Sequence, residues 1–432
     1  MKAAHIKLEA WIEKHEHEMI ALLQRLVQMP SDNPKGDCLA IAELVFNELS
    51  ALGFAPRMDV VPHEDVRAAG MIAVSNVVAD TRLGEGQGLV IVLNAHGDVV
   101  PPGDGWSCDP YGGMIEAGKL FGRGAAVSKS DIAVYTYAVM ALRDSGVWEA
   151  QQQQQQHQQP GGTLALAFTF DEETGGELGP KRLLEQGTIK PDYAIVAGFT
   201  HAAVTSHNGC LHLEVSLKGR SAHAAIPHTG ADALEAMTEV LMELYDYRAE
   251  LGQRHSGVIG IESPTLVVGL IQGGINTNVV PDRCTIRLDR RIIPEENPEL
   301  AEQELRELIA RTAARFPQIE LDVHRVLLAR PFCEVEGTEQ LLCALRPNWS
   351  AVMGGVEMPV VGVPLYADAR HFTEAGVPTV MFGAGPRTLE EANGHRADEH
   401  VQIRDLTLAV RILSFMLYDL LNDATFLAEN DK

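Results

Sequence analysis

The feature that most constrains the fold is an apolar run, residues 89–93, that leads into the sequence Asn-Ala-His-Gly-Asp. Such a run is typical of a buried strand in a parallel sheet. Gly97 ends the strand, so the imidazole of His96 and the carboxylate of Asp98 stand at its carboxyl end, where open α/β sheets place their chemistry. His96 is therefore a candidate metal ligand, with Asp98 as the partner of its other ring nitrogen. A core histidine satisfied by an aspartate is the alternative.

A second apolar run, residues 163–170, ends in three adjacent acids, Asp171, Glu172 and Glu173. Neighbouring carboxylates repel one another unless they share a cation or a proton. The pattern therefore indicates a metal site or a general base at the end of a second central strand. The alternative is an acidic helix start, which the positive end of the helix dipole would stabilise.

Length and charge bound the class of protein. The 432 residues exceed what one core usually serves, so two domains are expected. The net charge of −24 disfavours nucleic acid as a partner, and no apolar run is long enough to suggest a membrane partner. The six scattered cysteines are typical of reduced thiols, and residues 1–7 lead into no apolar stretch typical of a signal peptide, which together predict a cytoplasmic protein. The Gln151–Gln159 tract is expected to be a solvated loop.

The periodicity changes along the chain. Residues 5–29 and 38–52 have helical spacing, and the α/β pattern returns in the strands 358–361 and 378–383 and in a closing helix, 403–422. The part between them predicts a ferredoxin-like β-α-β-β-α-β unit with strands 211–217, 265–272, 284–290 and 319–326 and helices 231–251 and 299–316. We therefore expect an α/β domain with a central, mostly parallel sheet, formed by residues 1–208 and 327–432, and an inserted α+β domain at 209–326.

A set of motifs in one order resembles the zinc-dependent metallohydrolases and metallopeptidases that include aminoacylase, acetylornithine deacetylase, succinyl-diaminopimelate desuccinylase and glutamate carboxypeptidase. The resemblance covers residues 15–425, and the motifs that carry it are residues 95–101, 105–106, 122–125, 171–176, 219–223, 278–281, 289–291, 367–370, 383–385 and 394–399. It implies a zinc-peptidase-like catalytic domain and an inserted lid through which the chain forms a homodimer.

The resemblance also implies roles for single residues. Glu172 would be the general base and Asp98 the residue that orients a metal-binding histidine, while His223 would polarise the scissile carbonyl from the neighbouring subunit. The implied metal ligands are His96, Glu173 and His395. The elements that would grip a substrate carboxylate are Asn278, Arg291, Gly383 and Gly385.

Two positions depart from the family pattern. The family has a metal-bridging aspartate where this chain has Val127, and an acidic ligand where it has Gly198. Two imidazoles and one carboxylate remain, which suffice for one catalytic zinc, and cobalt or manganese would also suit them. We therefore expect one ion rather than two, and restoring both carboxylates should raise occupancy toward two. Asp131 or His201 could replace a lost ligand, although a helix-turn residue and a loop residue are the simpler interpretations.

The sequence thus predicts a metal-dependent amidohydrolase, similar to deacylases and carboxypeptidases, that cleaves an N-acyl amino acid or a small peptide with a carboxylate. A zinc-activated water would attack the amide with Glu172 as base. Two alternatives stay open. The chain could be a metal-poor, non-catalytic homologue that acts as a binding or dimer-partner protein, or a hydrolase with altered substrate chemistry.

Overall fold

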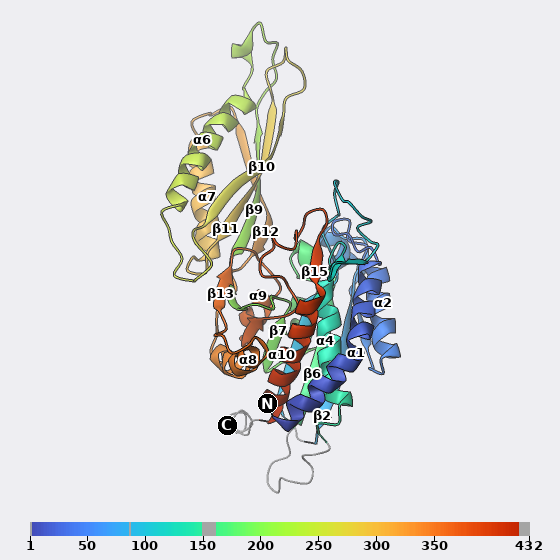
Figure 1. Cartoon of the computed structure of the whole chain (residues 1–432). Coiled ribbons are helices and arrows are strands. Elements are labelled where there is room, and N and C mark those ends of the chain that lie inside the picture. Colours follow the sequence, from blue (N-terminus) through green and yellow to red (C-terminus); the bar gives the residue numbers. More distant parts are fainter. Residues whose placement is uncertain (1, 86–87, 149–160, 423–432) are drawn as a thin grey trace. The chain divides into compact units, whose positions relative to one another are not determined.

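The computed structural model describes residues 2–85, 88–148 and 161–422, and these form two compact units (Figure 1). Unit 1 contains residues 1–205, 334–360 and 367–432, and unit 2 contains residues 206–333 and 361–366. The Gln151–Gln159 tract lies outside the described residues. Among the described helices, none has both the length and the apolar composition needed to cross a bilayer.

The large sheet has the strand order β1-β2-β6-β3-β7-β14-β8-β13. The four strands at its centre, β6-β3-β7-β14, are parallel, while β1, β2 and β8 run antiparallel to their neighbours. The predicted α/β class is confirmed. The strands are β1 (Arg57–Val60), β2 (Ser75–Gly84), β3 (Val90–His96), β6 (Gly161–Thr169), β7 (Tyr193–Val196), β8 (Ala203–His207), β13 (Val360–Val363) and β14 (Thr379–Met381).

Three long helices of unit 1 pack against one another, and the middle one, α4, contacts the sheet at β2, β3 and β6. From Lys129 to Leu142 every residue of α4 is buried, which explains why its polar members must find partners inside the protein. The helices are α1 (Ala3–Val27), α2 (Leu39–Ala51), α3 (His63–Ala68), α4 (Lys129–Asp144), α5 (Pro180–Glu185), α8 (Thr338–Val352), α9 (Ala369–Glu374) and α10 (Ile403–Asn422). A small sheet joins β15 (His400–Gln402), β5 (Lys119–Phe121) and β4 (Met114–Glu116).

Unit 2 is a four-stranded antiparallel sheet with two helices, and the predicted ferredoxin-like order is confirmed. The strand order is β10-β11-β9-β12, and both helices pack against the sheet. The elements are β9 (Gly209–Lys218), α6 (Ala233–Leu251), β10 (Thr265–Gly273), β11 (Arg283–Ile292), α7 (Pro298–Ala313) and β12 (Glu320–Ala329). The predicted insert, 209–326, lies within this unit, and its narrower boundaries stay a prediction.

Alternation along β9 fixes which face of this sheet meets the helices. Leu211, Leu213, Val215 and Leu217 are fully buried in the core that α6 and α7 share. Successive side chains of a strand point to opposite faces, so the residues between them lie on the face that these helices do not cover.

Candidate active site

His96 and Asp98 are held together at the carboxyl end of β3. The Nδ1 atom of His96 lies 3.3 Å from the Asp98 carboxylate and 3.1 Å from the Asp98 carbonyl oxygen. Both ring contacts therefore fall on Nδ1, and Nε2 is left as the nitrogen that can bind a metal. This geometry is the one expected for a ligand histidine with an orienting carboxylate.

Asp98 also positions the two glutamates. Its carboxylate accepts the backbone N–H groups of Glu172 (3.3 Å) and Glu173 (3.1 Å), and the side-chain amide of Asn33 (2.9 Å). The acids begin a 3-10 turn, Glu172–Thr174, directly after the end of β6. Because β3 and β6 are adjacent parallel strands, their carboxyl ends bring His96, Glu172 and Glu173 together, with one ligand atom of each within 4.8 Å of the others.

His395 reaches the same cluster from the loop before β15. Its Nε2 lies 3.5 Å from Oε1 of Glu173, and that oxygen is buried with no hydrogen-bond partner. A buried carboxylate oxygen without a donor is costly, because it has lost its hydration without a replacement. A cation between His96, Glu173 and His395 would satisfy it, so these residues fit the metal ion that the sequence implies.

The electrostatics of the cluster agree with that fit. Burial would lower the pKa of His96, but the surrounding carboxylates of Glu172, Asp98 and Glu173 raise this pKa well above its ordinary value. Burial raises the pKa of Glu172 well above its ordinary value. The cluster therefore holds more negative groups than can ionise together without a proton or a cation.

Asp131 is a buried carboxylate of α4 that the sequence analysis weighed as a replacement ligand. Its Oδ1 accepts the backbone N–H of Ala384 at 2.7 Å, and a Cβ atom at Gly383 would lie only 1.8 Å from that oxygen. Asp131 therefore fastens the loop after β14 to α4. Burial raises the pKa of Asp131 to about 7.

Gly198 is closed to any side chain. A Cβ atom there would lie 2.6 Å from backbone atoms of Met381 and Phe382. The substitution Gly198→Glu is therefore strained on this backbone, and the effect of the double replacement on metal occupancy stays a prediction. The physical reason is the direct contact between the chain at Gly198 and the end of β14.

The glycines expected to grip a substrate carboxylate use their own amides within unit 1. Gly385 N–H donates to the Gly198 carbonyl at 2.8 Å, and Gly383 N–H points to the Phe199 carbonyl at 3.4 Å. The loop at 383–385 pairs with residues 198–200 to satisfy its backbone. In this structure Asp131 and the backbone of Gly198 lie close to these glycines. The N–H groups of Gly383 and Gly385 already point to carbonyl oxygens, so they are not spare donors for a substrate carboxylate.

The loop that contains the motif at residues 122–125 is held by a buried carboxylate, which the sequence analysis did not predict. Glu399 is buried and pairs with Arg123, and its other oxygen accepts the backbone N–H groups of Gly124 (3.1 Å), Ala126 (3.1 Å) and Val127 (3.3 Å). Three backbone N–H groups of the loop that carries Val127 thus bind one carboxylate oxygen. His201, the other suggested replacement ligand, instead pairs with Asp405, 3.1 Å from its Nε2.

Unit 2 holds the remaining predicted site residues. His223 is exposed, and its Nδ1 accepts the N–H of Ala225 at 3.1 Å. In the neutral ring the proton therefore sits on Nε2, which makes Nε2 a donor. The loop of His223 pairs with that of Asn278, whose carbonyl accepts the N–H of Ala224 at 3.0 Å.

Arg291 lies at the other end of the sheet. On β11 its Nε donates to Oδ1 of Asp289 at 3.0 Å, and its Nη2 donates to Oδ2 at 3.2 Å. Burial would raise the pKa of Asp289, but the hydrogen bonds of His212 and Arg291 hold it below its usual range. The predicted carboxylate-binding arginine thus has an ionised partner within unit 2.

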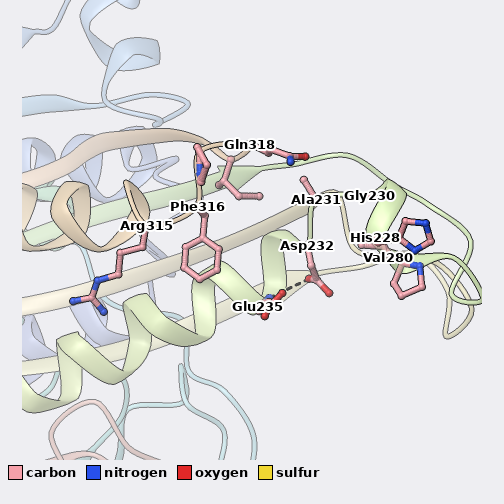
Figure 2. Close-up of a pocket in the computed structure, with 12 residues that line it drawn as sticks. His228, Gly230, Ala231, Asp232, Glu235, Val280, Arg315, Phe316 and Gln318 are labelled. Carbon is pink, nitrogen blue, oxygen red and sulfur yellow. Dashed lines mark hydrogen bonds between the residues drawn. The ribbon is translucent and has the colours of Figure 1, made fainter.

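Unit 2 also has a cavity of about 410 Å³ beside the start of α6 (Figure 2). Two of its charged side chains have partners within unit 2, and one of them, Asp232, accepts the N–H groups of Leu234 and Glu235 as the helix cap. Arg315 on its wall donates to Glu243 at 2.7 Å. We assign no function to this cavity.

Comparison with known proteins agrees with the site. The profile described as peptidase family M20/M25/M40 matches residues 92–419. The chain belongs to this family. It is 25% identical to a succinyl-diaminopimelate desuccinylase from a Nitratiruptor species, over 92% of this chain and 100% of the relative. It is 28% identical to an acetylornithine deacetylase from Proteus mirabilis, over 92% of this chain and 94% of the relative.

The fold is shared with a solved structure of the family, the Bacillus subtilis YXEP protein, described as a dinuclear metal binding peptidase. The TM-score is 0.63 at 14% identity, over 95% of this chain and 99% of that one. The M20 family consists of metallohydrolases that act on amide and peptide bonds, so the predicted family and enzyme class are confirmed.

The raised pKa of Asp131 predicts a stability change with pH. The folded state favours the protonated carboxyl, so its contribution is complete below the unfolded pKa and is lost as pH rises toward about 7. Between about pH 5.5 and 8, the free energy of unfolding, measured with urea, should fall by about 2 kcal/mol more in the unmodified chain than in Asp131→Asn. Asp419→Asn is the matched control, because the pKa of Asp419 is lowered and does not cross this window. Parallel curves for the chain and Asp131→Asn would contradict the assignment.

Proposed function

We propose that the chain is a metal-dependent amidohydrolase that removes an acyl group from an N-acyl amino acid or cleaves a small peptide. The observation that carries the proposal is the cluster of His96, Glu172 and Glu173, in which an oxygen of Glu173 accepts no hydrogen bond and lies 3.5 Å from Nε2 of His395. The desuccinylase and the deacetylase among the relatives support N-acyl amino acids as the substrate class. Cysteine spacing supports a cytoplasmic location, which stays a prediction.

The roles follow from the positions of the side chains. His96, Glu173 and His395 would hold zinc, or alternatively cobalt or manganese. The ion, when bound, would polarise the scissile carbonyl and lower the pKa of a water. Glu172 takes the proton of the attacking water and passes it to the leaving amine, a task for which it is placed beside His96 and Glu173. Asp98 keeps His96 in the tautomer that leaves Nε2 for the metal.

We propose one ion at this centre. The fold is shared with a dinuclear metal binding peptidase, but in this chain Val127 offers no ligand and Gly198 has no room for one. Asp131 is committed to Ala384, and His201 is committed to Asp405. The set that remains, two imidazoles and a carboxylate, is that of a single catalytic zinc with an open position.

Metal analysis tests this number. Elemental analysis of protein purified without chelators should show one ion fewer per chain in His96→Ala than in the unmodified chain. Taking the difference removes any ion bound elsewhere from the count. A difference of two ions, or no metal at all under zinc, cobalt or manganese loading, would contradict a single-ion centre. The second result would favour a non-catalytic binding protein.

Substitutions can distinguish the proposed role of Glu172 as base from that of Glu173 as metal ligand. Glu172→Gln should keep the metal and lower kcat by about 10²–10⁴, because the proton acceptor is lost. Glu173→Gln should instead lose the metal. The assay uses a panel of N-acetyl and N-succinyl amino acids and dipeptides, and Glu177→Gln, which changes a half-exposed acid nearby in the sequence, is the control. Normal turnover by Glu172→Gln would show that another group is the base.

The geometry of unit 2 supports a homodimer. His223 and Asn278 follow the end of the sheet where Arg283 of β11 pairs with Lys218 of β9, whereas Arg291 pairs with Cys210 at the opposite end. About eight residues of extended strand separate these ends by about 27 Å. A small substrate cannot touch both ends of one lid. If Arg291 and His223 serve the same reaction, they therefore come from different subunits.

A surface for the second subunit is present on the same unit. Strand β10 is at the edge of its sheet, and Val267, Leu270 and Ile271 on it are each more than half exposed. Met242 and Tyr245 of α6, which packs against β10, are exposed as well. An exposed, apolar edge strand invites pairing, and we propose that a second copy of this chain covers it.

In this dimer, His223 donates from Nε2 to the developing oxyanion of the neighbouring site, and Asn278 and Arg291 bind the substrate carboxylate. Gly383 and Gly385 contribute backbone that the substrate can approach closely. Shared sites of this kind predict that two inactive variants complement each other.

Complementation tests the shared site. Glu172→Gln and His223→Ala should each be nearly inactive, since removal of an oxyanion donor typically costs about 10²–10³ in rate. After subunit exchange, a heterodimer holds one intact site, so an equal mixture should regain about a quarter of the activity of the unmodified dimer. Each inactive variant taken alone through the same exchange procedure separates complementation from simple stabilisation. Activity no greater than the sum of the parts, or a monomer in sedimentation, would argue against it.

A further inference from the structure

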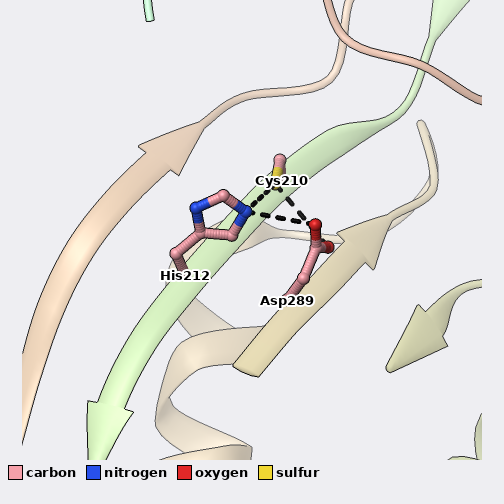
Figure 3. A group of neighbouring side chains, drawn as sticks. All are labelled: Cys210, His212 and Asp289. Atoms are coloured by element: carbon pink, nitrogen blue, oxygen red, sulfur yellow. Dashed lines mark hydrogen bonds and ion pairs between the residues drawn. The ribbon is translucent and has the colours of Figure 1, made fainter. Parts of the chain in front are cut away.

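A second group of metal-binding side chains lies in unit 2, apart from every ligand proposed for the catalytic centre. Cys210 and His212 of β9 and Asp289 of β11 each offer one ligand atom within 4.8 Å of the other two (Figure 3). His212 and Asp289 are directly opposite each other across the two strands. Alternation places all three side chains on the sheet face that α6 and α7 do not cover.

We propose that Cys210, His212 and Asp289 form a binding site for zinc or a similar thiophilic divalent cation. The site shares no ligand with the proposed catalytic centre, although its Asp289 is paired with Arg291, which we propose as a substrate-binding residue.

The distances between the donors match a tetrahedral ion. Sγ of Cys210 lies 3.1 Å from Nε2 of His212 and 3.7 Å from Oδ1 of Asp289, and Nε2 lies 3.1 Å from Oδ2 of Asp289. The usual zinc distances to sulfur, nitrogen and oxygen give ligand separations of about 3.4–3.6 Å at the tetrahedral angle. The thiol and the imidazole contact different oxygens of Asp289, so an ion bound through one of these oxygens also requires a rotation of the carboxylate.

The chemistry of the donors selects the ion. Thiolate and imidazole are ligands of zinc, cobalt and related metals, while calcium and magnesium require oxygen ligands. A thiolate and a carboxylate would bring two negative charges to a divalent ion, and Arg291 already offsets one of them. Three protein ligands leave a fourth position for water, and partial exposure of His212 and Asp289 gives the ion an entry path.

Arg291 contacts this group from the same unit, and it supports the site. It holds Asp289 with two hydrogen bonds, from Nε at 3.0 Å and from Nη2 at 3.2 Å. Carboxylate ligands of metals are commonly fixed in this way by an outer donor. The guanidinium disfavours a second positive charge nearby, and the thiolate supplies the negative charge that offsets it.

Cobalt is the probe that distinguishes this site from the catalytic centre. Cobalt bound to a thiolate gives a near-ultraviolet charge-transfer band, which the oxygen and nitrogen ligands His96, Glu173 and His395 cannot give. Titration of the reduced, full-length protein with Co²⁺ should therefore produce this band, with saturation at one equivalent per chain once the catalytic centre is removed by His96→Ala. The same band should persist in His96→Ala, whatever the fate of the catalytic metal.

Substitutions assign the ligands. Cys210→Ser should abolish the band, and His212→Ala should weaken Co²⁺ binding by more than the roughly 10–100-fold that outer groups contribute. Asp289→Asn gives a second measure if Cys210→Ser does not fold, and circular dichroism reports folding in each case. Cys284→Ser, which changes a buried thiol on the opposite face of the sheet, and Cys343→Ser, which changes an exposed one, should keep the band.

Two results would overturn the proposal. One is the absence of a charge-transfer band in the folded, reduced chain at saturating Co²⁺, which would leave a hydrogen-bonded trio of side chains. The other is a band that survives Cys210→Ser. Either result leaves the hydrolase proposal intact, because that proposal depends on turnover and on the metal lost with His96→Ala.

Discussion

The arrangement of the site depends on the carboxylate of Asp98. This carboxylate contacts Nδ1 of His96. It also accepts hydrogen bonds from the side-chain amide of Asn33 and from the backbone N–H groups of Glu172 and Glu173. One fully buried anion therefore fixes a candidate ligand, a candidate base and a second ligand relative to one another. Its own charge is balanced by donors and not by a basic side chain, which leaves the net negative character of the pocket to attract a metal ion.

Much of the site could be predicted because it stands at the ends of two neighbouring parallel strands. Apolar runs identified β3 and β6, and their polar ends are His96, Glu172 and Glu173. His395 follows from no local pattern, since it joins the cluster from a distant loop near the end of the chain, and only the family resemblance indicated it. The insert was predictable from its alternating strands, because one face of its sheet is buried against helices.

Other features were hidden for physical reasons. Helix α8 contains Pro347 and is preceded by Gly337, so it lacks the usual sequence signals of a helix. Asp131 lies within a wholly buried helix, and no pattern along α4 tells that its partner is the backbone of Ala384, 253 residues later. Glu399 resembles any surface acid in the sequence, yet it organises the loop of Arg123 and Val127. Long-range pairing of this kind is a property of the fold and not of a local segment.

The two positions that depart from the family pattern, Val127 and Gly198, are constrained by the structure in different ways. Val127 sits in a loop whose course Glu399 sets through three backbone N–H groups, so a side chain at this position can change while the loop keeps its path. Gly198 is fixed by packing, because the end of β14 occupies the space that a Cβ atom would need.

Gly198 is also joined to the loop after β14, by the hydrogen bond from Gly385 to its carbonyl oxygen. Asp131 holds Ala384 of the same loop. The backbone at the second metal position is thus built from close glycine contacts around one buried carboxylate. The single-ion centre that we propose would keep the candidate base, the orienting aspartate and one ligand set on this backbone. These are the groups that single-metal hydrolysis of an amide requires.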